Sequence, residues 1–195
     1  RGKSQVGTFD PISYDVKLVE GGMNIEDVEY KEVDDFTGEK LIEQARGAWE
    51  QAGYTLDPST FGYCYKQNGR YCIELNDTTE NLFLSCITNK DGKLLELRNT
   101  QNNWQDKNFD YDNLYPDTQL AEEAGKKVME FLKEANPVDM KRVDHLKLQC
   151  WYEEDNELYF EFCEDPLAQD WDGFLVVVKV KPDWQLMYYS CFSNG

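Results

Sequence analysis

The chain has 195 residues, of which 41% are hydrophobic and 14% aromatic, and its formal net charge at pH 7 is −18. This apolar content excludes a disordered acidic tail, and the negative charge disfavours nucleic acid and anionic membrane surfaces as partners. No apolar run approaches the roughly 20 residues that a membrane-spanning helix needs, so we expect a chain that folds and does not span a membrane.

The first residues, "RGKSQVGTF", contain neither a methionine nor an apolar signal core. We therefore expect a mature or trimmed fragment. A signal peptide, membrane anchor or lipid anchor ahead of it would place the protein outside the cytoplasm.

Residues 1–34 are predicted to be an N-terminal extension with one or two strands. "ISYDVKLVE" alternates apolar and polar residues, and "IEDVEYKEV" gives a weaker second run after the turn-like "GGMN". These runs either extend the sheet that follows or form a partly ordered stalk.

Residues 35–100 are predicted to form a first unit of one helix and four antiparallel strands. A helical stripe begins after Thr37 and ends at Gly53. Two pairs of alternating runs follow, one around Asn68-Gly69 and one around Asp91-Gly92, and both dipeptides favour tight hairpin turns. The stripe consists of Leu41, Ile42, Ala45, Ala48, Trp49 and Ala52.

Residues 101–116 are predicted to be a linker, although they contain the spacing of a calcium loop. The possible ligands at positions 1, 3, 5, 7 and 12 of such a loop are Asp106, Asn108, Asp110, Asp112 and Asp117. Position 6 is Tyr111 where the loop needs glycine, and Asp117 is shorter than the usual glutamate. We favour a linker that Phe109, Tyr111 and Tyr115 anchor, and keep calcium as the weaker alternative.

Residues 117–195 repeat the same order of elements. Asp117 or Thr118 caps a helix that Pro137 closes, and two hairpins turn near Asp155-Asn156 and Pro182-Asp183. The sequence therefore predicts an internal duplication and an α+β fold: two similar units, each with one helix packed on a four-stranded antiparallel sheet.

The helix "LAEEAGKKVMEFL" and the hairpins "ITNKDGKLLEL" and "VKVKPDWQLMY" resemble those of the PepSY and PepSY-like domains of secreted bacterial proteins. The resemblance covers residues 35–100 and 117–192, and the second copy departs from it with Trp184 where the first has Gly92. It implies an interaction domain, as found in propeptides of thermolysin-like metalloproteases and in envelope proteins that hold or regulate a hydrolase.

The six cysteines allow either three disulfides or six buried thiols. A three-residue loop at residues 67–69 would place Cys64 opposite Cys72, Cys150 and Cys163 flank the second hairpin, and Cys86 and Cys191 remain. Free thiols stay an equal alternative. Because the chain has no CxxC pair and one histidine, we expect no metal–thiolate site and no cofactor.

Catalytic motifs such as GxSxG and HExxH are absent, and we expect His145 to lie on the surface. Three tryptophans in or beside polar loops, Trp104, Trp171 and Trp184, are weak candidates for contacts with carbohydrate or protein, with packing at the edge of the core as the alternative.

The sequence thus favours a non-enzymatic, extracytoplasmic protein-interaction module that regulates or inhibits a partner such as a peptidase or cell-wall hydrolase. An exposed sheet edge or the groove between the two copies would engage that partner by strand addition or aromatic anchoring. The alternative is a carbohydrate- or peptide-binding protein that uses the groove between the repeats.

Overall fold

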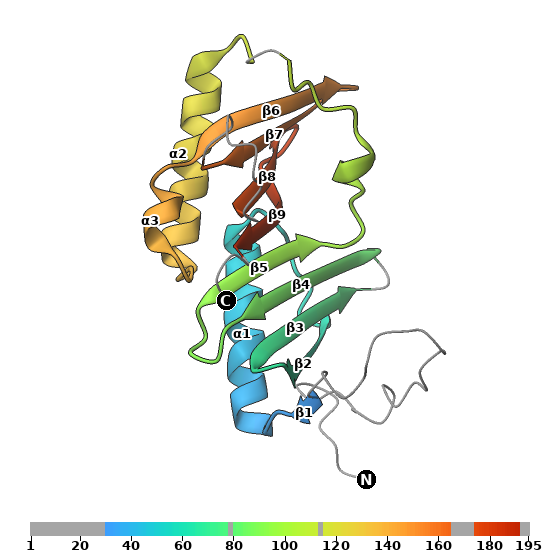
Figure 1. The fold of residues 1–195 in the computed structure, drawn as a ribbon. Coiled ribbons are helices and arrows are strands. Elements are labelled where there is room, and N and C mark those ends of the chain that lie inside the picture. The colour runs from blue at the N-terminus through green and yellow to red at the C-terminus, as the bar shows by residue number, and fades with distance from the viewer. Residues whose placement is uncertain (1–29, 78–79, 113–114, 165–173, 192–195) are drawn as a thin grey trace, which may run out of the picture.

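The computed structural model describes residues 30–77, 80–112, 115–164 and 174–191, and within them the strands form one antiparallel sheet (Figure 1). Its strand order is β1-β2-β3-β4-β5-β9-β8-β7-β6. The strands are β1 (Tyr30–Glu32), β2 (Phe61–Gln67), β3 (Arg70–Asp77), β4 (Leu82–Thr88), β5 (Leu94–Asn99), β6 (Lys147–Glu154), β7 (Glu157–Cys163), β8 (Phe174–Lys181) and β9 (Gln185–Cys191). The helices are α1 (Asp35–Gln51), the 3-10 turn η3 (Trp104–Asp106), α2 (Thr118–Glu134) and α3 (Met140–Val143).

The prediction of two units, each with its own four-stranded sheet, was wrong. Strand β5 pairs with β9, with Leu97 directly opposite Tyr189, so the strands of both halves belong to one sheet. In two separate sheets, β5 and β9 would each leave an edge of unpaired backbone groups. Their pairing removes both edges.

Each of the two long helices begins directly after an aspartate that caps its N-terminus. Asp34 accepts a hydrogen bond from the backbone N–H of Thr37 (2.9 Å), and Asp117 accepts one from Leu120 (3.0 Å), so each satisfies a donor that has no partner inside its helix. The predicted helices are confirmed, and α1 starts two residues earlier than its apolar stripe indicated.

Both helices pack on the same face of the sheet, which we call the helix face. One cross-strand row runs across the sheet and comprises Cys64, Ile73, Cys86, Leu97, Tyr189, Val176, Phe162 and Leu148. Ile73 and Cys86 line a groove together with residues of α1. At the other end of the row, a Cβ added at Gly125 of α2 would lie 3.4 Å from the Phe162 ring.

A backbone hydrogen bond joins the C-terminal end of each long helix to the β5 or β9 strand of the other half. The N–H of Leu186 in β9 donates to the carbonyl of Ala52 (2.9 Å), and the N–H of Leu94 in β5 donates to that of Asn136 (2.8 Å). Gly53 has a positive φ of 99°, and a Cβ there would collide with the carbonyl of Trp184. These reciprocal contacts join the two halves beyond the sheet itself.

The β2–β3 turn is one residue shorter than the loop that would pair Cys64 with Cys72. Asn68 and Gly69 form a two-residue turn with φ of 51° and 73°, so Cys64 lies opposite Ile73. A shift of one residue moves a side chain to the other face, and Cys72 therefore points away from Cys64. All six cysteines are free and buried.

Strand β1 extends the sheet beyond β2, and it comes from the second run predicted in the N-terminal extension. The first predicted run, "ISYDVKLVE", lies outside the described residues. Among the helices that the structure describes, none combines the length and the apolar character needed to cross a bilayer.

Candidate functional site

The segment that joins β5 to α2, described over residues 100–112 and 115–117 and called here the crossover segment, passes around the β6 edge of the sheet (Figure 1). The Trp104 ring packs against Tyr188 (centroids 5.5 Å apart). Because Tyr188 neighbours the helix-face residue Tyr189, this contact lies on the opposite face. Tyr115 packs against Trp151 and Phe160 (5.2 and 5.0 Å) on the way to α2.

Of the three aromatic residues predicted to anchor this segment, Phe109 and Tyr115 are each 7% exposed and serve as anchors. Tyr111 instead is 63% exposed. Its side chain is the most exposed aromatic group of the crossover segment's described residues and is available to a partner.

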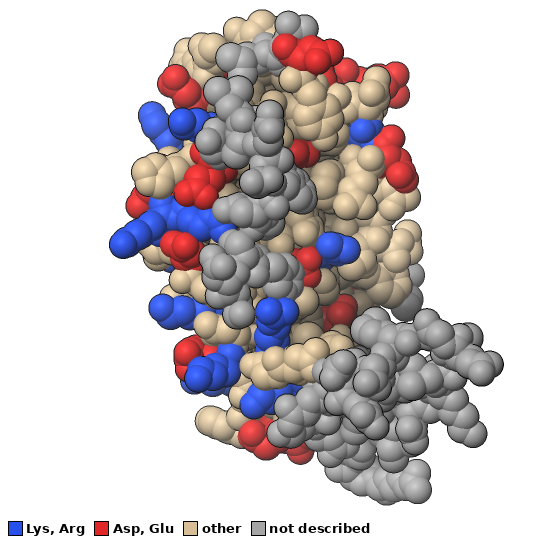
Figure 2. Space-filling view, viewed as in Figure 1, with Lys and Arg blue, Asp and Glu red and all other residues tan. Residues whose placement is uncertain are grey.

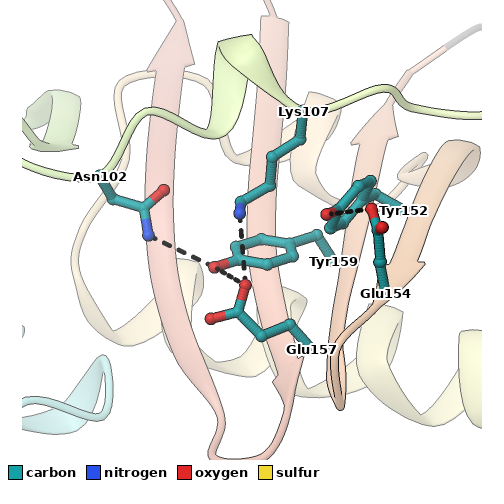
Figure 3. Close-up of polar contacts among 6 residues, drawn as sticks. All are labelled: Asn102, Lys107, Tyr152, Glu154, Glu157 and Tyr159. Carbon is teal, nitrogen blue, oxygen red and sulfur yellow. Dashed lines mark hydrogen bonds and ion pairs between the residues drawn. The ribbon is translucent and has the colours of Figure 1, made fainter.

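Lys107 fixes the crossover segment to the face opposite the helices (Figure 3). Its Nζ pairs with Glu157 (3.3 Å) and lies 5.0 and 4.8 Å from the ring centroids of Tyr152 and Tyr159. Tyr159 donates to the same Glu157 carboxylate (3.3 Å) and accepts a longer bond from Asn102 (3.4 Å). Burial raises the pKa of Tyr159, so its hydroxyl stays protonated as a donor.

A groove lies between the crossover segment and the outer strand β6, with a volume of about 600 Å³. We call it the β6-edge groove; residues 108–112 and 151–154 line it. These nine lining residues include Asp110, Asp112, Glu153 and Glu154 but no lysine or arginine. Figure 2 shows acidic side chains gathered at the upper right, toward the end of β6 in Figure 1.

Two groove carboxylates are held by tyrosine hydroxyls. Tyr152 donates to Glu154 (2.9 Å) and Tyr115 donates to Glu153 (3.3 Å). The hydrogen bond to Glu154 is the main cause that raises the pKa of Tyr152, and burial followed by Glu153 raises that of Tyr115. Both tyrosine hydroxyls therefore stay protonated at neutral pH and remain hydrogen-bond donors to these carboxylates.

The backbone of β6 also faces this groove. The N–H of Asp110 donates to the carbonyl of Trp151 (2.6 Å), which identifies Trp151 as a residue whose backbone groups point away from β7. Antiparallel pairing alternates the direction of these groups, so the N–H and C=O of Glu153 point outward too. A partner strand could continue the pairing that Asp110 begins.

The five calcium candidates are not assembled as one ligand set. Asp110 accepts from the N–H of Asp112 (3.0 Å), and Asp117 is used as the α2 cap. Asp106 ends η3, before the segment reaches β6. Over the described ranges, no group of three or more His, Cys, Asp or Glu side chains is arranged to hold a metal ion.

The structure does not bring Trp104 and Trp184, the two candidate tryptophans that it describes, together. Trp104 lies on the face opposite the helices, whereas Trp184 packs against Phe131 and Lys127 of α2 (6.3 and 4.4 Å). Trp171 lies outside the described residues. The groove between α1 and the end of α2, about 330 Å³, is lined by residues such as Ala45 and Asn136 and by neither Trp104 nor Trp184.

Sequence reasoning missed three partly or fully buried carboxylates on the face opposite the helices. Burial raises the pKa of Glu161, which is 3% exposed, to about 7. Burial and then the nearby Glu96 raise that of Glu74 to about 7. Glu96 pairs with Arg98 (3.2 Å). A lone glutamate inside the apolar runs "CIEL" and "FEFC" is the signal that could have identified two of them.

His145, the one histidine, is exposed just after α3. Comparisons with protein-family models, with curated proteins and with solved structures found no match. The resemblance to PepSY domains stays a prediction.

Proposed function

We propose that this protein is a non-enzymatic interaction module that binds a basic, extended segment of a partner protein in the β6-edge groove. The observation that carries the proposal is the combination, in one groove, of an outer strand with four carboxylates and no cationic side chain. The outer strand favours an extended backbone in the bound segment, and the carboxylates favour basic side chains.

The strand selects an extended backbone. An outer strand presents N–H and C=O groups that a partner segment can pair with, and such strand addition gives affinity that depends little on side chains. Asp110 occupies the position beside Trp151, and the outward groups of Glu153 lie further along β6. The incoming segment would pair with the outward backbone groups of Glu153, one residue before β6 ends.

The carboxylates select basic side chains. Two of them, Glu153 and Glu154, are exposed, so lysine or arginine side chains can reach them without complete loss of solvent. Exposed charge pairs contribute modestly to affinity but strongly to the rate of association and to the choice of partner. The net charge of −18 adds a long-range attraction for cations that salt screens.

Aromatic rings complete the groove. Tyr111 is largely exposed, and Trp151 and Tyr152 are partly exposed. A guanidinium or ammonium group above such a ring gains a further cation–π interaction, which a segment with neutral side chains would not make.

The partner class follows from the PepSY resemblance as part of the same proposal. The partner is a peptidase or cell-wall hydrolase outside the cytoplasm, and binding of one of its basic strands or tails would hold or inhibit it. No described residue of this chain acts as a catalyst in this account.

Fluorescence anisotropy with labelled peptides tests the proposal. A peptide of alternating lysine and valine should bind, and its affinity should fall as salt is raised, whereas the matching glutamate–valine peptide should not bind. Changing Glu153 and Glu154 to glutamine should weaken binding by roughly threefold to tenfold, since each removes an exposed charge but keeps a hydrogen-bonding group.

The matched control changes Glu122 and Glu123, two adjacent exposed glutamates of α2, to glutamine. It removes the same two negative charges as the groove variant but leaves the groove intact. If the control and the groove variant lose equal affinity, binding follows net charge alone and the proposed site is wrong.

A further inference from the structure

The groove between α1 and the C-terminal end of α2, called here the interhelical groove, lies on the helix face. It is lined by residues of α1, by residues of β3, β4, β5 and the β4–β5 turn, and by residues 134–136. Its volume of about 330 Å³ lies at the lower end of the range for small-molecule sites, roughly 300–1,000 Å³. Because it shares no lining residue with the β6-edge groove, it can have a role of its own.

The floor of the interhelical groove is apolar. Five of its lining residues are each at most 8% exposed, namely Leu41, Ala45, Ile73, Cys86 and Leu94. Burial raises the pKa of Cys86 to about 12, so its side chain is an uncharged thiol and behaves as a small apolar group. The floor can therefore cover the apolar part of a small ligand.

Small residues of α1 leave the groove open. Ala45 and Ala48 contribute only methyl groups to the lining, and Gly47 contributes no side chain. A Cβ added at Gly47 would meet no atom within 4 Å. A larger side chain at this position would therefore occupy open space at the groove without a clash.

The α2 end of the groove presents negative charge and hydrogen-bond acceptors. Glu134 is exposed and is the one charged residue among the described lining residues. The N–H of Ala135 donates to the carbonyl of Phe131 (3.0 Å). The N–H of Asn136 donates to that of Lys133 (3.3 Å). These backbone donors are thus engaged, whereas the last carbonyls of a helix have no donor within it and give its C-terminus a partial negative charge.

We propose that the interhelical groove binds a small organic cation. The apolar body of the ligand lies on the floor, and its ammonium group lies at the end of α2. An ammonium group has hydrogen-bond donors and no acceptor, so it matches an end of the groove that presents acceptors. Its positive charge is attracted both by Glu134 and by the helix C-terminus.

Charge disfavours the alternative ligands. An organic anion would meet Glu134 and the α2 C-terminus, and the described lining contains no lysine or arginine. Lys133, the nearest cation along the chain, is not a lining residue and pairs with Asp144 (2.6 Å). A neutral apolar molecule would cover the floor but would give the acceptors at the α2 end no donor.

Amide shifts in the ¹⁵N-labelled whole chain at about pH 7 test this proposal. The probes are 2-phenylethylamine, 2-phenylethanol and 3-phenylpropionate, which share a ring and differ in charge. The amine should shift the amides of groove residues such as Gly47, Gly92 and Asn136. The alcohol should bind there about tenfold more weakly, and the carboxylate should not bind.

Two variants separate the contribution of charge from that of the floor. Glu134→Gln removes the charge and should weaken binding of the amine about fivefold while leaving the alcohol unchanged. Gly47→Leu should weaken binding of both probes about tenfold, because it occupies the open space beside α1. Glu122→Gln, at an exposed position of α2 outside the groove, is the matched control and should leave both affinities unchanged.

The proposal is overturned if 2-phenylethylamine shifts no amide of the interhelical groove, or if its largest shifts lie in the β6-edge groove. It is also overturned if the alcohol binds as tightly as the amine, or if Glu134→Gln and Gly47→Leu both bind the amine as the unmodified chain does. None of these outcomes depends on peptide binding at β6.

Discussion

Leu97 of β5 and Tyr189 of β9 lie directly opposite each other at the junction of the two halves of the sheet, and both are fully buried. In the pairs on either side, Glu96 lies opposite Ser190 and Arg98 lies opposite Tyr188. The hairpin strands "LLEL" and "LMYY" thus meet antiparallel at equivalent positions. The last strand of each half serves as an interior strand of one shared sheet.

This junction predicts a single cooperative unfolding transition. Leu97→Ala removes a fully buried side chain and should lower the free energy of unfolding by about 3 kcal/mol. Leu120→Ala, at a partly buried position of α2, should cost less than half as much. Denaturant curves followed by tryptophan fluorescence and by far-UV circular dichroism should coincide, and two separate transitions would contradict a shared core.

The six thiols should be inaccessible in the folded protein. Burial raises the pKa of Cys64 and Cys86 to about 12 and that of Cys72 to about 11, so little reactive thiolate forms. Ellman's reagent should detect almost no thiol in the folded chain and six after unfolding without reductant. Detection of none after unfolding would show three disulfides.

Glu161 should make the protein less stable as pH rises. Its folded pKa of about 7 lies above its ordinary value of 4.5, so the folded state holds a proton that the unfolded state releases. The stabilising effect of this proton is complete below about pH 4.5 and is lost as pH rises through about 7. Glu161→Gln should therefore raise stability at about pH 8 by about 3 kcal/mol and change little at about pH 4.

Thermal melts across this pH range measure the effect. Glu43→Gln, at an exposed position of α1, is the control and should shift the melting temperature little at either pH. Equal stabilisation of the Glu161 variant at both ends of the range would show that the carboxyl does not titrate as the burial predicts.

Alanine substitutions at Gly53 and Gly69 distinguish the stability cost of backbone strain from that of a lost tertiary contact. Both have positive φ, but a Cβ at Gly69 meets nothing within 4 Å, whereas one at Gly53 collides with the backbone of Trp184. Gly69→Ala should cost about 1 kcal/mol, and Gly53→Ala about 3 kcal/mol, because the second also displaces the β8–β9 turn from the end of α1. Equal losses measured by urea unfolding would mean that this contact contributes nothing.

Helices and hairpins could be predicted because their signals are local. Asp34, Asp117 and the Asn68-Gly69 turn act within a few residues of themselves. The joining of β5 to β9 is not local, and alternation alone does not say which edges pair. One signal was present: "LMYY" is apolar or aromatic on both faces, as interior strands are, whereas "LLEL" carries Glu96 on the face opposite the helices.

The site was harder to predict than the fold. The sequence placed polar and aromatic residues at 106–117, but only the path of the crossover segment around β6 brings Asp110 and Asp112 beside Glu153 and Glu154. Because residues 108–112 and 151–154 lie far apart along the chain, no local pattern in the sequence indicates that they line one groove. A difference of one residue in a turn likewise decided that Cys64 and Cys72 point to opposite faces.

The most direct test of the central claim is a map of amide shifts in a ¹⁵N-labelled sample titrated with the lysine–valine peptide. Strand addition at the β6-edge groove predicts the largest shifts at residues 108–112 and 151–154, with slowed hydrogen exchange at the outward N–H of Glu153. Shifts spread over the exposed acidic residues of α1 and α2, with none concentrated along β6, would contradict it.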